Sequence, residues 1–196
     1  MGNNKELDLI IWGATGFTGN LVCEYISRSY SDSSLRWGIA GRNKEKISAV
    51  GKKLKIDKEK IFIADSNDFE SLIKLTSKTK VICTTVGPYA KFGTNLIKAC
   101  IETSTNYCDI TGETQWIRRI IDKYHTTSKN KKIKIVNSCG FDSVPSDMGV
   151  FYSQKMLLEK TGKYATKINM RVAGAKGGIS GGTYNSLSNV LEEARF

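Results

Sequence analysis

The chain of 196 residues is long enough for one large domain, or for one domain and the start of a second. Hydrophobic residues make up 40% of it, which excludes an intrinsically disordered chain. The formal net charge of +11 favours anionic partners, but acidic and basic side chains alternate along residues 44–60. Because no basic stripe with interleaved aromatics is present, we expect no nucleic-acid partner.

Apolar clusters alternate with helical patterns along the first 138 residues, which is typical of repeated βα units around a parallel sheet. The predicted strands are residues 7–12, 35–41, 60–65, 80–87, 106–111 and 132–138. The predicted helices between them are residues 17–30, 44–54, 68–76, 95–103 and 115–127. The first strand is apolar at nearly every position, as expected for a strand buried on both faces. The fold class is therefore α/β, a Rossmann-type doubly wound parallel sheet.

Three helices carry more specific expectations. The stripe of the first helix that should face the core consists of Leu21, Val22, Tyr25 and Ile26. Asp68 should cap the third helix. The single histidine, His125, lies late in the fifth helix, and we expect it to be exposed rather than catalytic.

The pattern changes after residue 142. Residues 140–160 indicate a loop and a helix, residues 165–174 a strand, and residues 177–196 a glycine-rich turn that enters another helix. We therefore predict an NAD(P)-binding Rossmann domain over residues 1–142. Residues 143–196 are predicted to hold the beginning of an incomplete α+β substrate or catalytic domain.

The five cysteines are odd in number, widely spaced and contain no Cys-x-x-Cys pair. This argues against a disulfide framework or a structural zinc site and favours a reducing compartment. The first nine residues lack the apolar segment of a signal peptide, and no apolar run approaches the ~18 residues of a membrane helix. We therefore expect an intracellular, cytoplasmic protein with no metal site.

A glycine-rich segment, GATGFTG, follows the first strand directly. In a Rossmann turn one glycine makes the tight turn, a second lets the backbone approach a pyrophosphate, and a third allows close helix–strand packing. The helix N-terminus then offers free N–H groups to the phosphates. The alternative is a plain glycine-rich βα turn. The dinucleotide interpretation places the cofactor against Gly13, Ala14, Thr15, Gly16, Phe17, Thr18 and Gly19.

Arg42 follows the second strand, where an NAD site requires an acidic residue for the ribose 2′-OH. A guanidinium fits a 2′-phosphate, so NADP(H) is predicted in preference to NAD(H), although a solvent-exposed arginine is the alternative. Asp65, after the third strand, either contacts the adenine or caps a turn. After the fourth strand, the nicotinamide half is expected at Thr85, Val86 and Gly87, with Tyr89 directed at the same crevice.

Polar side chains also follow the fifth and sixth strands. The carboxyl ends of parallel strands are where an open α/β sheet binds ligands. The residues concerned are Asp109, Thr111, Gly112 and Glu113 after the fifth strand, and Cys139, Asp142 and Asp147 after the sixth. Such residues also cap helices, and for Asp147 we favour the cap.

The order of these motifs resembles the saccharopine dehydrogenase-like oxidoreductases, which include the trans-acting enoyl reductases. The resemblance rests on GATGFTG, AGR, TTVGPYAKFG, YCDITGE, CGFDSVPSD and SGGT. It implies that Tyr89 and Cys139 are catalytic, with Tyr89 as the proton donor. Because GFDSVPSD departs from the GxDPG-like loop of true saccharopine reductases, a lipid-like substrate is favoured over an amino acid. Family members have about twice this length, and eukaryotic ones associate with lipid droplets and membranes.

The leading hypothesis is an NADP(H)-dependent oxidoreductase that transfers hydride to or from a carbonyl, imine or enoyl group of a small-molecule substrate. The alternative is a dinucleotide-binding scaffold without turnover, associated peripherally with membranes or lipid droplets. A homodimer is a further expectation. A short-chain dehydrogenase is disfavoured because no tyrosine has lysine four positions later.

Overall fold

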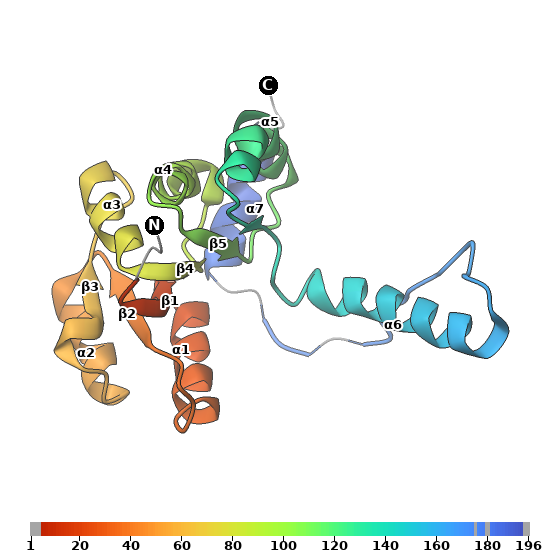
Figure 1. The fold of residues 1–196 in the computed structure, drawn as a ribbon, viewed down its shortest axis with the longest axis horizontal. Helices are drawn as coiled ribbons and strands as arrows, with labels where there is room; N and C mark the ends of the chain where they lie inside the picture. Colours follow the sequence, from red (N-terminus) through yellow and green to blue (C-terminus); the bar gives the residue numbers. More distant parts are fainter. Residues whose placement is uncertain (1–4, 175, 179–180, 194–196) are drawn as a thin grey trace.

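The computed structural model describes residues 5–174, 176–178 and 181–193. Its centre is one parallel six-stranded sheet with the strand order β3-β2-β1-β4-β5-β6 (Figure 1). The chain builds the sheet outward from β1 in one direction and then from β4 in the other, which confirms the predicted doubly wound fold. The strands are β1 (Leu7–Trp12), β2 (Trp37–Gly41), β3 (Ile61–Ile63), β4 (Thr79–Thr84), β5 (Asn106–Asp109) and β6 (Ile135–Val136).

Helices cover the sheet from both sides (Figure 1). One layer consists of α1 (Phe17–Ser29) and α2 (Lys44–Lys53), and a single 3-10 turn, η1 (Lys58–Lys60), precedes β3. The other layer consists of α3 (Phe69–Ser77), α4 (Tyr89–Glu102) and α5 (Thr114–Asn130). Strand β1 supplies core residues to both layers. Ile10 and Trp12 pack with α3, α4 and α5, whereas Ile11 packs with α1 and α2.

The buried stripe of α1 differs from the prediction. Leu21 and Tyr25 are 50% and 54% exposed, and the residues that α1 buries are Gly19, Cys23 and Ile26. The rotation of the helix is determined at its first turn, because Gly19 lies directly against the carbonyl group of Gly13. A contact between the helix and the preceding loop therefore decides which residues face the sheet.

The structure confirms the predictions for the third and fifth helices. Asp68 caps α3 as predicted, since its carboxylate accepts a hydrogen bond from the backbone N–H of Ser71 at 3.1 Å. His125 is exposed on α5, also as predicted.

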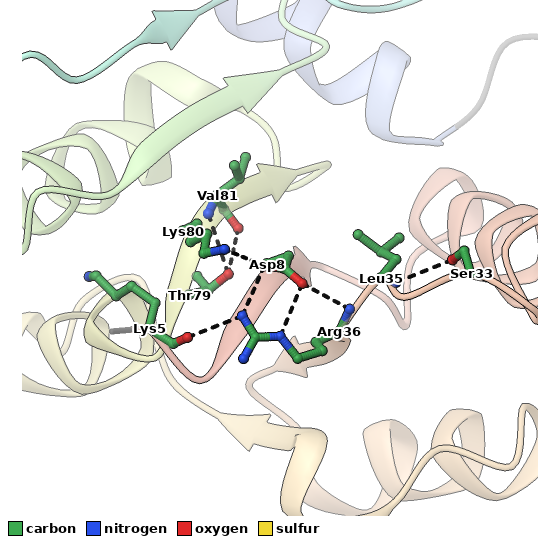
Figure 2. Close-up of polar contacts among 8 residues, drawn as sticks. All are labelled: Lys5, Asp8, Ser33, Leu35, Arg36, Thr79, Lys80 and Val81. Atoms are coloured by element: carbon green, nitrogen blue, oxygen red, sulfur yellow. Dashed lines mark hydrogen bonds and ion pairs between the residues drawn. The ribbon is translucent and has the colours of Figure 1, made fainter. Parts of the chain in front are cut away.

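At the end of the sheet where the strands begin, Asp8 of β1 joins both neighbouring strands (Figure 2). Its carboxylate lies 3.0 Å from the guanidinium of Arg36, just before β2, and 2.7 Å from the ammonium group of Lys80 on β4. These interactions hold the pKa of the Asp8 carboxyl well below its usual range. The ion pairs therefore hold β2, β1 and β4 together at the end opposite the glycine-rich loop.

The C-terminal part contains α6 (Val144–Thr161) and α7 (Gly181–Glu193). Helix α6 projects away from the sheet and has no buried residue (Figure 1), whereas α7 returns to the segments that follow β4 and β5. The strand predicted over residues 165–174 is wrong, because that segment has no regular structure. A strand needs a hydrogen-bonded neighbour, and in the described part of the chain no strand pairs with this segment. The assignment of residues 143–196 to a second domain stays a prediction.

Candidate cofactor site

The glycine-rich loop turns tightly between β1 and α1. Gly13 has a φ of +91°, a conformation that favours glycine, and its N–H donates to the carbonyl of Ala40 on β2 at 3.0 Å. The N–H of Gly16 then donates back to the carbonyl of Gly13 at 2.9 Å. The loop thus closes on itself directly above the end of β1.

The three glycines meet different surroundings. A Cβ atom at Gly13 would lie 2.6 Å from Cγ2 of Val86, so this glycine lets the loop approach the segment after β4. A Cβ atom at Gly19 would collide with the Gly13 carbonyl and lie 2.8 Å from Oγ1 of Thr85. At Gly16 the added atom would meet only the Gly13 oxygen, at 3.3 Å. Gly16 is therefore the glycine whose missing side chain leaves space for a ligand.

A cavity of about 310 Å³ lies above this loop. All but one of the predicted cofactor contacts line it, and the exception is Ala14, whose side chain is fully buried in the core beneath the loop. The predicted residues that line the cavity are Gly13, Thr15, Gly16, Phe17, Thr18, Gly19, Arg42, Asp65, Thr85, Val86 and Gly87. Helix α1 also begins at this cavity, and its first turn has no capping side chain and no acidic residue. Its free backbone N–H groups could therefore bind an anion in the cavity.

Sequence reasoning missed several lining residues: Trp12, Gly41, Ser66, Asn67, Phe92 and Gly182. Ser66 and Asn67 directly follow Asp65 after β3, so their position could have indicated them. Gly182 comes from α7, and no local pattern shows that this distant helix returns to the cavity.

Two charged side chains reach the cavity from the ends of β2 and β3. Arg42 is exposed and brings a guanidinium to the rim. The carboxylate of Asp65 accepts a hydrogen bond from the backbone N–H of Asn67 at 2.8 Å, so one of its oxygens holds a turn. An adenine contact by Asp65 stays a prediction.

A second cavity of about 270 Å³ adjoins the first. Thr18, Thr85, Gly87 and Gly182 line both cavities, so the segment after β4 forms the boundary between them. The other lining residues are Tyr89, Ile110, Thr111, Gly112, Glu113, Asp142, Thr183, Ser186, Leu187 and Val190.

Tyr89 lies at the wall of this second cavity but is only 4% exposed. Its hydroxyl donates to the backbone carbonyl of Thr84 at 3.3 Å, and its ring packs 5.7 Å from that of Trp116. Burial raises the pKa of this hydroxyl well above its usual range. In this position the hydroxyl faces the protein backbone, so proton donation to a substrate stays a prediction that requires the side chain to move.

Glu113 has a role that its place in the sequence did not indicate. Its carboxylate is buried, and its two oxygens accept hydrogen bonds from the backbone N–H groups of Tyr89 and Ala90, each at 2.8 Å. These are the first two N–H groups of α4. A negative charge at a helix N-terminus is favourable, so Glu113 fixes the point at which α4 leaves the crevice.

Asp109 organises the ends of β5 and β6. Its fully buried carboxylate accepts hydrogen bonds from the Tyr107 hydroxyl and the Asn137 amide at 2.8 and 2.7 Å, and from two backbone N–H groups, those of Thr111 and Ser138. Burial raises the pKa of this carboxyl despite these bonds. The backbone carbonyl of Asp109 also accepts from the N–H of Cys139 at 2.7 Å.

Cys139 is exposed beside the sheet and lines neither cavity. Partial burial and the neighbouring Cys108 and Asp109 raise the pKa of its thiol. The structure therefore does not bring Tyr89 and Cys139 together in one cavity, and the catalytic role of Cys139 stays a prediction. Asp147 lies exposed in the first turn of α6, outside both cavities.

The family model described as the saccharopine dehydrogenase NADP binding domain matches residues 9–136, which run from β1 to the end of β6. The chain belongs to this family. The match covers the sheet, the glycine-rich loop and the ends of all six strands, and so includes every element that lines the first cavity except α7.

Curated relatives extend the similarity beyond the sheet. A Mycobacterium tuberculosis protein of the trans-acting enoyl reductase group is 38% identical over 192 residues, covering 97% of this chain and 45% of the relative. The trans-acting enoyl reductase of Mycobacterium leprae is 32% identical, covering 96% of this chain and 46% of the relative. The chain thus spans somewhat less than half the length of the curated relatives it matches.

Solved structures share the fold. A saccharopine dehydrogenase (L-Glu forming) of Saccharomyces cerevisiae in its apo form has a TM-score of 0.60 at 19% identity, over 80% of this chain and 32% of that one. The triphenylmethane reductase of Citrobacter sp., complexed with NADP(H), has a TM-score of 0.51 at 18% identity, over 66% of this chain and 48% of that one. At this identity the likeness concerns the fold alone.

Two further observations bear on the expectations from the sequence. Over residues 5–174, 176–178 and 181–193, no helix is both long and apolar enough to cross a membrane. Among the same residues, no three His, Cys, Asp or Glu side chains are grouped in a way that could hold a metal ion.

Proposed function

We propose that this chain is the cofactor-binding part of an NADP(H)-dependent oxidoreductase. The observation that carries the proposal is one cavity lined by the glycine-rich loop, by the cationic Arg42 and by the segment after β4. The chain's membership of the saccharopine dehydrogenase NADP binding domain family supports the same cofactor.

The residues present fit such a cofactor. The open space at Gly16 and the N-terminus of α1 suit a pyrophosphate. Arg42 suits a 2′-phosphate, because a guanidinium can donate two parallel hydrogen bonds to phosphate oxygens. Thr85, Val86 and Gly87 would then lie against the nicotinamide half, at the boundary with the second cavity.

When bound, the cofactor would supply a hydride, and the protein would supply binding, orientation and electrostatics. We assign the second cavity to the acceptor, a carbonyl, imine or enoyl group. The names of the relatives favour the enoyl group. Ile110, Leu187 and Val190 give this cavity apolar walls, which favours a lipid-like substrate.

The alternative is a dinucleotide-binding scaffold without turnover. It is favoured by the inward position of the Tyr89 hydroxyl and by the position of Cys139 outside both cavities. Peripheral attachment to membranes or lipid droplets, a cytoplasmic location and a homodimer all stay predictions.

One experiment on the full chain distinguishes the oxidoreductase from the scaffold. NADPH absorbance is followed after addition of an enoyl thioester, a ketone or an imine, and cofactor binding is measured in parallel by fluorescence. Oxidation of NADPH with the enoyl thioester supports the oxidoreductase. Binding without oxidation across the three acceptors supports the scaffold, and absence of binding contradicts both.

A further inference from the structure

Two cysteines lie side by side on neighbouring strands, one residue before the crevice. Cys83 of β4 is the register partner of Cys108 of β5 in the parallel sheet. Partners in register point to the same face of a sheet, and neighbouring strands are about 4.8 Å apart. Both thiols are free.

The face that carries them is only partly covered. On this side of the sheet α1 and α2 pack over β1, β2 and β3. Val136, the register partner of Cys108 on β6, is 48% exposed on the same face, and both Cys83 and Cys108 are partly exposed. Helix α6, which follows β6, buries none of its residues against this face. A small reagent in solution therefore has access to the pair.

The two thiols also influence each other's ionisation. The neighbouring Cys108 side chain lowers the pKa of the Cys83 thiol, while the pKa of the Cys108 thiol is raised. A lowered pKa increases the share of thiolate, which is the reactive form of cysteine.

We propose that Cys83 and Cys108 form an oxidation-sensitive dithiol that a hydroperoxide converts into a disulfide between β4 and β5. The Cys83 thiolate attacks one peroxide oxygen, the O–O bond breaks, and the other oxygen leaves as an alkoxide or hydroxide that takes up a proton. The Cys108 sulfur then attacks the resulting sulfenic acid, the S–S bond forms, and the sulfenic oxygen leaves as water with the Cys108 proton. One peroxide is thereby reduced and two thiols are oxidised.

The spacing brings this bond within reach. A strand separation of about 4.8 Å lies within the Cα–Cα range of about 4.4–6.8 Å found for disulfides, and the two Cβ atoms must approach from about 4.8 Å to the range of about 3.5–4.5 Å. The bond would form immediately before Thr84 and Asp109, the last residues of the two strands. The disulfide would form whether or not a cofactor is bound, because both cysteines lie within the sheet.

The other cysteines differ from this pair. Burial raises the pKa of Cys23 to about 12 and that of Cys100 still further, and both side chains are fully buried. Cys139 is exposed, but the pKa of its thiol is also raised. We therefore expect the disulfide to join Cys83 and Cys108 selectively.

The test is peroxide treatment of the full chain, alkylation of remaining thiols, tryptic digestion and mass spectrometry. Cys83 falls in the peptide 81–91, and Cys108 falls in the peptide 99–118 together with Cys100. We expect these peptides to be linked with the loss of two hydrogen atoms, and the link to disappear after treatment with dithiothreitol.

Three variants assign the bond. Cys83→Ser and Cys108→Ser should each abolish the link, whereas Cys100→Ala should retain it. Circular dichroism checks that each variant is folded. If a variant does not fold, the cross-link in the unmodified chain still tests the proposal. A link that survives in Cys108→Ser, a link from Cys139, or oxidation of single cysteines without any link would overturn the proposal.

Discussion

The buried carboxylate of Glu113 accepts a hydrogen bond from the backbone N–H of Tyr89, the first residue of α4, at 2.8 Å. Its other oxygen accepts from the N–H of Ala90. Helix α4 begins directly after Gly87 and Pro88, and Gly87 lines both cavities. Glu113 is therefore the residue that positions the boundary between the proposed cofactor cavity and the proposed acceptor cavity.

Replacing Glu113 with glutamine should destabilise the chain. The amide keeps one accepting oxygen, but its NH₂ group would face a backbone N–H that also donates. Leaving a buried donor unpaired costs about 1–3 kcal/mol. Urea unfolding followed by circular dichroism measures this loss. Glu102→Gln at the exposed end of α4 is the matched control and should change stability by no more than about 0.5 kcal/mol. Equal stability of the two variants would contradict this role.

The three glycines of the loop should respond differently to alanine. At Gly19 the new Cβ would collide with the Gly13 carbonyl, and the backbone cannot move without displacing α1. We expect a loss of about 3 kcal/mol, measured by urea unfolding. At Gly16 the added atom meets only the Gly13 oxygen at 3.3 Å, so the fold should be retained.

Gly16→Ala should instead weaken NADPH binding by about tenfold or more, because the methyl group occupies the space assigned to the pyrophosphate. Isothermal titration of the folded variant with NADPH measures this effect. If Gly16→Ala binds NADPH as tightly as the unmodified chain, the phosphates lie elsewhere.

The Asp8 ion pairs predict a pH dependence of stability. Hydrogen bonds from Arg36 and Lys80 depress the pKa of Asp8 in the folded chain below its usual value near 4. A depressed pKa means that the stabilisation is present above pH ~4 and is lost as the pH falls through the folded-state pKa. Because the basic side chains are about half exposed, the effect is modest, and Asp8→Asn should lower Tm at pH 7 by about 2–4 °C.

The difference in Tm between Asp8→Asn and the unmodified chain should shrink below pH 4. Thermal unfolding over a pH series measures it, with Asp57→Asn as the control. Among the described residues Asp57 pairs with the nearby Lys60 alone, in an exposed position, so its removal should matter less. A difference for Asp8→Asn that stays constant down to pH 2 would contradict the ion-pair account.

The sheet could be predicted because each strand is indicated by residues that are close together in the sequence. Each apolar strand is bounded by its own turn residues, and the alternation with helices predicts parallel strands in a doubly wound order. Most residues that line the first cavity could be predicted for the same reason, since they directly succeed β1, β2, β3 and β4.

The features that escaped prediction depend on contacts between distant parts of the chain. The rotation of α1 is set by the approach of Gly19 to Gly13, not by the apolar stripe of the helix. Residues 165–174 have the composition of a strand but no strand to pair with among the described residues. The inward-facing hydroxyl of Tyr89 and the capping role of Glu113 both arise where α4 and the β5–α5 loop meet in space.

We propose that Arg42 recognises a 2′-phosphate in the cavity above the glycine-rich loop. The most direct measurement compares the dissociation constants of NADPH and NADH, by fluorescence titration, for the unmodified chain and Arg42→Ala. Arg28→Ala, an exposed arginine in the last turn of α1, is the control. If Arg42 binds the 2′-phosphate, the unmodified chain and Arg28→Ala will bind NADPH at least about tenfold more tightly than NADH. Arg42→Ala will lose this preference and retain its NADH affinity. Equal affinities for the two cofactors in the unmodified chain, or an unchanged preference in Arg42→Ala, would contradict it.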